Sequence, residues 1–181
     1  MGTRPDRIVL IGLRRSGKTT VGRLLAQATG WELRDTDDMV RETTGRTPAD
    51  WIRSAGLDAF RAAESAAVAT LFRARDVVIA TGGGAPISVK NREILRPASL
   101  VAYLRVDPWV LAERARTDPD AALRPPLGGG ATDEEPFILT AERDLLYRSF
   151  CDLIVDGARS PHEVAACILD AAKLGKKTIR D

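Results

Sequence analysis

A chain of 181 residues has the usual size of one compact domain and can bury a core without disulfides or metals. Apolar residues make up 44% of the chain and charged residues 29%, a balance typical of globular proteins rather than disordered or fibrous ones. The 27 basic and 25 acidic residues leave a formal charge of only +2, which provides no overall field for binding nucleic acid.

The N-terminal residues and the cysteines predict where the protein works. Residues 1–7 are polar and lack the apolar centre of a signal peptide, and no later run approaches the roughly 18 apolar residues of a membrane span. Cys151 and Cys167 form no C-x-x-C pair, and we expect both to be buried thiols in a reducing compartment. We therefore expect a cytoplasmic protein that binds neither membranes nor nucleic acids.

Apolar, strand-like runs alternate along the chain with stretches of helical spacing. The runs that predict strands are residues 8–11, 32–34, 77–80, 100–104 and 153–155. The stretches that predict helices are residues 21–30, 59–72, 108–116, 134–150 and 161–173. Strands that alternate with helices in this way predict β-α-β units with right-handed crossovers. The expected fold is α/β, with a parallel sheet of about five strands flanked by helices.

Two stretches interrupt this alternation and predict the domain organisation. The first, residues 37–63, looks helical but has polar faces, as an inserted substrate module would. The second, residues 118–133, is rich in proline and glycine and has no apolar period, which predicts a mobile loop. We predict one domain over residues 1–181, with a core of about 1–35, 65–117 and 134–181, a substrate-binding insert of about 36–64 and a lid of about 118–133.

The first predicted strand and helix flank a Walker A pattern, G-x-x-x-x-G-K-T, at residues 12–19. Glycines let backbone N–H groups turn toward phosphates, and the following helix directs its positive end at them. Lys18 is placed to reach the β- and γ-phosphates of ATP, and the Thr19 hydroxyl to ligate Mg²⁺. The predicted nucleotide-binding residues here are Gly12, Arg15, Ser16, Gly17, Lys18, Thr19 and Thr20.

Two carboxylates, Asp35 and Asp37, follow the second predicted strand, where the carboxyl edge of the sheet would bring them near the phosphates. One could orient Mg²⁺ through water while the other accepts the proton of a substrate hydroxyl. We assign Asp35 to the metal, together with Thr19, and Asp37 to the substrate. The same pattern also occurs in solvated turns and helix caps.

Three glycines, Gly82, Gly83 and Gly84, follow the third predicted strand. They provide no side-chain packing, so a close approach of substrate to the main chain explains them best. A plain flexible turn is the alternative.

In this order, these motifs resemble those of the shikimate kinases, and the resemblance extends over essentially the whole chain. The matching segments are the phosphate loop Gly12 to Thr19, Asp35 and Asp37, Phe60-Arg61, Gly82 to Gly84, Arg124-Pro125, and Arg143 with Tyr147-Arg148. The resemblance implies a P-loop kinase fold and a monomeric, Mg²⁺-dependent, ATP-dependent enzyme. It implies phosphorylation of shikimate to shikimate 3-phosphate, on the route to aromatic amino acids.

The resemblance also implies roles for several side chains. Arg61 and Arg143 would bind the substrate carboxylate as forked donors, and Asp37 would accept the hydroxyl proton. Arg124, on the lid, would stabilise the charge that develops on the transferred phosphoryl group.

The adenine contact has two candidates. Arg114, in the helix before the lid, resembles the arginine that stacks on adenine in this family. Arg116 lies two residues further on and is the rival. We prefer Arg114.

The chain departs from the family pattern at several positions. Arg15 stands where a third loop glycine is usual, so either the backbone there needs no positive φ or the loop is strained. Arg41 and Leu57 replace residues that are commonly acidic, and Pro48 and Ile52 stand where larger apolar groups are usual.

These departures leave room for other functions. The chain could be a related P-loop kinase that acts on another small polyhydroxy acid or cyclic polyol, such as gluconate, or on a nucleotide. A different class is a binding module that senses nucleotide and signals to a protein partner.

Overall fold

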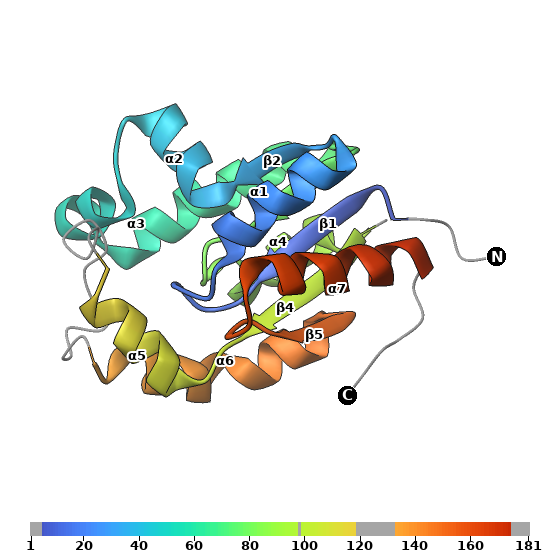
Figure 1. The fold of residues 1–181 in the computed structure, drawn as a ribbon. Helices are drawn as coiled ribbons and strands as arrows, with labels where there is room; N and C mark the ends of the chain where they lie inside the picture. The colour runs from blue at the N-terminus through green and yellow to red at the C-terminus, as the bar shows by residue number, and fades with distance from the viewer. Residues whose placement is uncertain (1–4, 98, 119–132, 175–181) are drawn as a thin grey trace.

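The computed structural model describes residues 5–97, 99–118 and 133–174, which form a parallel sheet between two layers of helices (Figure 1). The strands are β1 (Arg7–Ile11), β2 (Glu32–Asp35), β3 (Val77–Ala80), β4 (Ser99–Arg105) and β5 (Leu153–Asp156). They form a 5-stranded sheet in the order β2-β3-β1-β4-β5, and every pairing is parallel. The predicted α/β fold with a five-stranded parallel sheet is confirmed.

The described helices are α1 (Lys18–Thr29), α2 (Thr36–Thr44), α3 (Pro48–Thr70), α4 (Val89–Leu95), α5 (Pro108–Arg116), α6 (Glu135–Phe150) and α7 (Pro161–Leu174). Two short 3₁₀ turns, η1 (Leu71–Arg73) and η2 (Ala85–Ile87), adjoin α3 and α4. Each predicted helix is present, whereas α4 was not predicted. Its 7 residues are too few to show an apolar period, although Ser88 caps it by accepting the N–H of Asn91.

The predicted insert, residues 36–64, contains α2 and most of α3. A capping box between Thr47 and Asp50 starts α3. The helix is then broken at Gly56, whose φ of 85° and ψ of 169° are not helical. The helix predicted at residues 59–72 is therefore the second half of α3 with η1, and the break separates it from the half that begins in the insert.

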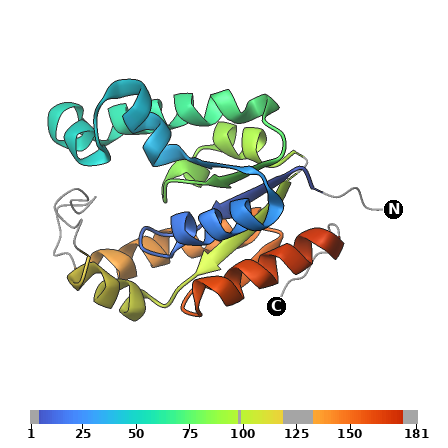
Figure 2. The ribbon, with the colours of Figure 1, turned by 45° about the horizontal axis from the view of Figure 1, so that its top comes forward.

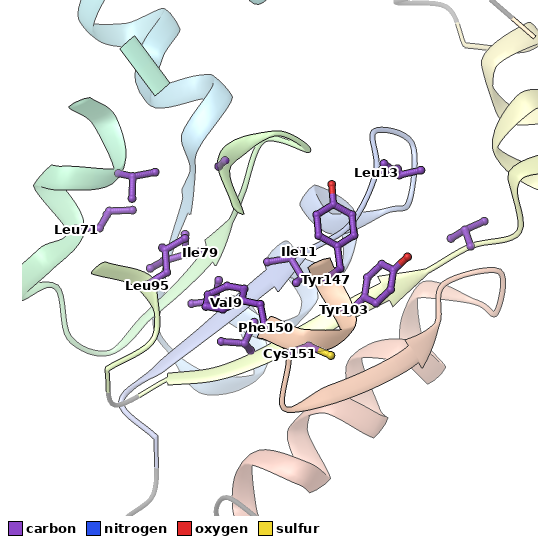
Figure 3. Close-up of a cluster of buried hydrophobic side chains, with 14 of the residues drawn as sticks. Val9, Ile11, Leu13, Leu71, Ile79, Leu95, Tyr103, Tyr147, Phe150 and Cys151 are labelled. Atoms are coloured by element: carbon purple, nitrogen blue, oxygen red, sulfur yellow. The ribbon is translucent and has the colours of Figure 1, made fainter. Parts of the chain in front are cut away.

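Helices cover both faces of the sheet (Figure 2), and each face has its own apolar core. Successive residues of β1 point to opposite faces, so Ile8 and Leu10 pack with α1 and α7, whereas Val9 and Ile11 pack with α3, α4 and α6. Figure 3 shows the second cluster, in which Tyr147 of α6 lies over the sheet beside Val9 and Ile11. Burial on both faces explains why β1 is apolar throughout.

The strand order brings the three motifs to one edge of the sheet. Leu10 of β1 and Asp35 of β2 are both paired with Ala80 of β3, so the three strands end side by side. β1 also lies between β3 and β4, where the order of connections reverses direction. In parallel α/β sheets, ligands bind beyond the carboxyl ends of the strands at such a reversal.

Part of the predicted lid cannot be compared with the structure. Residues 119–132, which include Arg124, lie outside the described residues, so the lid and the role of Arg124 remain predictions. The division into core, insert and lid also remains a prediction.

The cysteines differ from each other in burial. Cys151 is buried as predicted, but Cys167 is exposed on α7, so the prediction was wrong for Cys167. Among the helices of the described part of the chain, none has the length and apolar character needed to cross a membrane.

Candidate active site

A cleft of about 710 Å³ opens at the edge of the sheet where β1, β2 and β3 end, and residues of α3, α5 and α6 complete it. The basic residues that line it are Arg14, Arg15, Lys18, Arg23, Arg41, Arg61, Arg114 and Arg143. The acidic residues that line it are Asp35, Asp37, Asp38, Glu64 and Asp118. Basic side chains outnumber acidic ones, so the cleft concentrates the small positive charge of the chain and favours anionic ligands.

Most of the predicted site residues meet in this cleft. Those that line it are Arg15, Gly17, Lys18, Thr19, Thr20, Asp35, Asp37, Arg61, Gly83, Gly84, Arg114 and Arg143. Gly12, Ser16 and Gly82 are buried behind this lining. The arrangement joins a phosphate loop to a carboxylate and arginine cluster in one cavity.

The Walker A loop owes its shape to glycines at both ends. Gly12 has a φ of 148°, and a Cβ there would lie 2.7 Å from the Leu104 carbonyl oxygen. Gly17 has a φ of 93° and caps the N-terminus of α1. Lys18 is buried against the loop, where its ammonium donates to the Leu13 carbonyl at 2.7 Å. Its amine is therefore held beside the backbone that would surround phosphates.

The structure shows whether the backbone at Arg15 has the positive φ that a loop glycine usually supplies. Its φ is 65°, so the loop requires a left-handed conformation there even though the residue is not glycine. Such a conformation costs an L-residue about 1 to 2 kcal/mol. The guanidinium forms an ion pair with Asp118, with Nε 2.9 Å from Oδ2.

Thr19 and Asp35, the two predicted metal ligands, are hydrogen-bonded to each other. The Thr19 hydroxyl donates to Asp35 Oδ2 at 2.7 Å, and the other carboxylate oxygen caps α2 by accepting the N–H of Asp37 at 3.0 Å. Asp35 is therefore a helix cap as well as a member of the cleft.

This oxygen pair fits Mg²⁺. The ion prefers oxygen ligands, and in phosphate-transferring sites it usually keeps waters and binds substrate phosphates through one or two carboxylates. No cluster of three or more His, Cys, Asp or Glu side chains that could hold a metal occurs among the described residues.

Asp37 faces a second buried carboxylate. Glu64, on α3, is only 1% exposed. Burial raises the pKa of Asp37 to about 7, and the Glu64 and Asp35 carboxylates add to the rise, while Lys18 and Arg61 oppose it. Burial also raises the pKa of Glu64. A carboxylate with a pKa near neutrality is well matched to accepting a proton.

The glycines after β3 make room for these side chains. A Cβ on Gly82 would lie 2.6 Å from Asp37 Oδ1 and would overlap Glu64 Oε1, and a Cβ on Gly84 would overlap the Arg61 guanidinium. The Gly82 N–H also donates to the Thr36 hydroxyl at 2.7 Å in a buried position. The turn is fixed by the site, which contradicts the plain flexible turn. Substrate contact at these glycines remains a prediction.

The two predicted carboxylate-binding arginines reach the glycine turn from different helices. Arg61, on α3, donates to Glu64 Oε2 at 2.7 Å. Arg143, on α6, is 7% exposed and donates to the Gly83 carbonyl at 3.3 Å. Tyr147 also donates to that carbonyl, which anchors the turn to the core shown in Figure 3. Both arginines line the cleft, and each guanidinium has more donors than these contacts use.

The structure separates Arg114 from Arg116. Arg114 lines the cleft and donates to the Arg15 carbonyl at 2.9 Å and the Gly157 carbonyl at 3.1 Å. Arg116 is not part of the lining, and it forms an ion pair with Asp133 at 3.0 Å. Of the two, Arg114 lines the cleft, and its contact with adenine stays a prediction.

Two cleft residues, Glu64 and Arg14, were missed from the sequence. Glu64 accepts from Arg61, and Arg14 pairs with Glu135 at 2.8 Å. Tyr147 was matched to the family, but its hydrogen bond to the glycine turn was not predicted. Glu64 could have been found, because it lies one helical turn after Arg61. The partner of Arg14 is 121 positions away, and local patterns contain no such signal.

Comparison with known proteins decides the family. Residues 14–173 match the family model described as shikimate kinase. The chain belongs to the shikimate kinase family. The family uses ATP as co-substrate, and the proteins with its fold are P-loop kinases, so the binding-module alternative is contradicted.

Relatives in the family match over most of their length. The shikimate kinase of Oleidesulfovibrio alaskensis is 42% identical over 164 residues, which cover 91% of this chain and 95% of that protein. Shikimate kinase 2 of Yersinia pseudotuberculosis is 41% identical over 162 residues, covering 90% and 92%. The structure of the shikimate kinase of Acinetobacter baumannii in complex with shikimate has a TM-score of 0.86 at 30% identity, covering 96% and 95%.

Proposed function

We propose that the cleft transfers the γ-phosphoryl group of ATP to the 3-hydroxyl of shikimate, giving ADP and shikimate 3-phosphate. The observation that carries the proposal is the meeting, in one cavity, of the Walker A loop with Asp37 and two arginines, Arg61 and Arg143. The product would enter the biosynthesis of aromatic amino acids. Membership of the shikimate kinase family supports both the reaction and the acceptor.

The nucleotide end of the cleft is formed by the Walker A loop and α1. Loop N–H groups and Lys18 would surround the phosphates, and Arg114 would lie against the adenine. Mg²⁺, when bound by Thr19 and Asp35 through oxygen and water, would neutralise charge on the β- and γ-phosphates. Thr20, exposed at the start of α1, would complete the contacts with phosphate.

The acceptor end is formed by side chains of α2, α3 and α6. Arg61 and Arg143 would bind the shikimate carboxylate, because a guanidinium presents planar, paired donors. Asp37 would accept the proton of the attacking hydroxyl as the new bond to phosphorus forms. The glycine turn, Gly82 to Gly84, would present its backbone to the sugar-like ring.

Arg124 is proposed as the catalytic residue supplied by the lid. A cation that reaches the transferred phosphoryl group only when the site closes would stabilise the transition state more than the ground state. Closure would also keep water from taking the phosphoryl group.

One observation favours a second candidate acceptor. Arg41, Pro48 and Ile52, which differ from the usual family residues, all line the cleft. Arg41 is paired with Asp38 at 2.9 Å, so a basic group stands near the acceptor end. These side chains would alter the fit, and another cyclic polyol or polyhydroxy acid is the alternative substrate.

A coupled assay tests the proposal. ADP release from ATP and Mg²⁺ is measured with shikimate, with gluconate, with other cyclic polyols, and without acceptor. Stimulation by shikimate well above every other compound is the expected result. Equal or greater stimulation by another polyol would replace shikimate as the substrate, and ADP release that no acceptor changes would overturn the kinase proposal.

We place this activity in the cytoplasm and in a monomer. All the side chains given a role above come from one chain, so one copy can form the site. Sedimentation of the purified protein at working concentration tests the monomer, and fractionation of cells tests the location.

A further inference from the structure

Arg15 holds an energetically unfavourable backbone conformation inside the Walker A loop. Its φ of 65° favours glycine, and an L-residue with a side chain is disfavoured there. Residues kept in such conformations tend to cluster where ligands bind. The backbone conformation therefore does not explain why an arginine stands here instead of glycine, and the reason must lie in its side chain.

The Arg15 side chain is buried and incompletely paired. It is 6% exposed, and its Nε is 2.9 Å from Asp118 Oδ2. Its Nη2 is buried and has no hydrogen-bond partner among the described residues. A guanidinium has five N–H donors, and leaving one of them buried without an acceptor is unfavourable.

The residue that carries this unfilled donor lines the cleft at the predicted phosphate site. Arg15 lines the same cleft as Lys18 and Thr19, within the loop whose N–H groups would contact phosphate. Its carbonyl accepts a hydrogen bond from Arg114, so the backbone at this point is held in place. Guanidinium and phosphate form short, paired, charge-assisted hydrogen bonds. A polyphosphate is thus the ligand that would fill the open donor of Arg15.

Building on the kinase function proposed above, we propose that Arg15 is a second phosphate-binding cation and that Asp118 competes with nucleotide for it. In the free protein Asp118 holds the guanidinium at the wall of the cleft. When a nucleoside di- or triphosphate binds, phosphate oxygens take up the donors of Arg15, and the ion pair with Asp118 weakens. Asp118 is then a positioning residue that lowers nucleotide affinity.

A purely structural ion pair would behave differently. If Arg15 and Asp118 only held the loop in shape, loss of either partner would loosen the loop and weaken nucleotide binding. If Asp118 competes with phosphate, its loss strengthens binding. The two explanations therefore predict opposite signs for the same substitution.

The test measures ATP, ADP and AMP binding by calorimetry for Arg15→Gly, Asp118→Asn and the double variant. Glycine adopts a φ of 65° freely, so Arg15→Gly removes the side chain and keeps the loop conformation. We expect Arg15→Gly to weaken ATP binding about tenfold, which corresponds to about 1.4 kcal/mol, because a charge-assisted contact is lost. AMP binding should change little. Asp118→Asn should tighten ATP binding about threefold, because the competing charge is gone.

The double variant separates release of Arg15 from general electrostatics. Removing a negative charge near phosphate could tighten binding by itself, but that gain would persist when Arg15→Gly is also present. We expect the gain to disappear in the double variant. Glu113→Gln is the matched control, because it removes an acidic group from α5, the helix just before Asp118, that pairs with Arg116 and lies outside the cleft lining. It should leave ATP binding unchanged.

Three results would overturn the proposal: weaker ATP binding in Asp118→Asn, a gain that persists without Arg15, or unchanged ATP binding in Arg15→Gly. If Arg15→Gly fails to fold, as judged by circular dichroism, Arg15→Lys replaces it, since lysine keeps the charge but loses the paired donors. None of these measurements uses shikimate. Failure here leaves the acceptor assay intact, and a different acceptor leaves this result intact.

Discussion

The two ends of the cleft are built in different ways. The nucleotide end is mostly backbone, shaped by Gly12 and Gly17 within one short stretch of sequence. The acceptor end is mostly side chain, with Asp37, Arg61 and Arg143 contributed by α2, α3 and α6. A backbone site depends on conformation, whereas a side-chain site depends on charge and on the partners that orient it. Substitutions at the two ends should therefore fail in different ways.

The largest effect is expected at the nucleotide end. Lys18→Met removes the ammonium that would act on the transferred phosphate, and we expect turnover to fall at least about 100-fold. The fold should persist, because the loop shape depends on its glycines. Steady-state kinetics and circular dichroism check both parts. Lys173→Met, on the exposed face of α7, is the control, and retention of about a tenth of the turnover by Lys18→Met would contradict the role.

Asp37→Asn tests whether a change at the acceptor end leaves the nucleotide end intact. The amide keeps the shape but cannot accept the hydroxyl proton, so we expect kcat to fall by about two orders of magnitude. ATP binding should be nearly unchanged, because Asp37 belongs to the acceptor end. Kinetics together with calorimetry measure the two quantities. Near-normal kcat would rule out the proton-accepting role, and lost ATP binding would place Asp37 with the metal ligands.

Arg143→Lys should give a smaller effect confined to the acceptor. Lysine keeps the charge but lacks the planar pair of donors, so KM for shikimate should rise about tenfold with KM for ATP little changed. Initial rates with each substrate varied in turn provide the comparison. A defect in ATP alone would assign Arg143 to the phosphates.

The last effect, which leaves catalysis aside, concerns stability and its dependence on pH. The pKa of Asp37 is about 7 in the folded protein, against about 3.9 for an unfolded aspartate. The folded state therefore binds the proton more tightly, and this group lowers the free energy of unfolding as pH rises from about 4 to about 7. Asp37→Asn should thus have a higher Tm than the parent, with a gap that is larger at about pH 8 than at about pH 5.

That gap should be on the order of ten degrees at about pH 8, because each pKa unit corresponds to about 1.4 kcal/mol and about 1 kcal/mol shifts Tm by roughly 2 to 4 °C in a chain of this size. Thermal melts in a chelator, without nucleotide, measure it. A difference in Tm that does not change with pH would show that the buried Asp37 carboxylate does not destabilise the folded protein.

The same contrast explains what could be predicted from sequence. The strands and the Walker A loop are local features, and apolar runs and glycine spacing are enough to find them. The break in α3 at Gly56 was missed because one glycine within a helical pattern has several explanations. Asp118 could not be matched to Arg15, because the two are 103 positions apart and only the fold brings them together.

Resemblance to a family supplied the acceptor residues, but not the carboxylate that orients them. The pairing of Arg61 with Glu64, and the reason for Gly82 and Gly84, became visible only when α3 was placed against the turn after β3. Side-chain networks of this kind depend on tertiary contacts, which cannot be predicted from the spacing of apolar residues along the sequence.

The two apolar clusters bear on how such an enzyme can diversify. The helix that follows the phosphate loop is anchored through Val21 and Leu25 on one face of the sheet. The helices that carry the two arginines, α3 and α6, are anchored on the other face, through Val68, Leu139 and Tyr147. Tyr147 is labelled in Figure 3. The two clusters are separated by the backbone of the sheet, so a mutation that changes the packing of one cluster does not contact the other directly. Selection could therefore retune the choice of acceptor over many generations while the anchoring of the phosphate-binding helix stays under separate constraint.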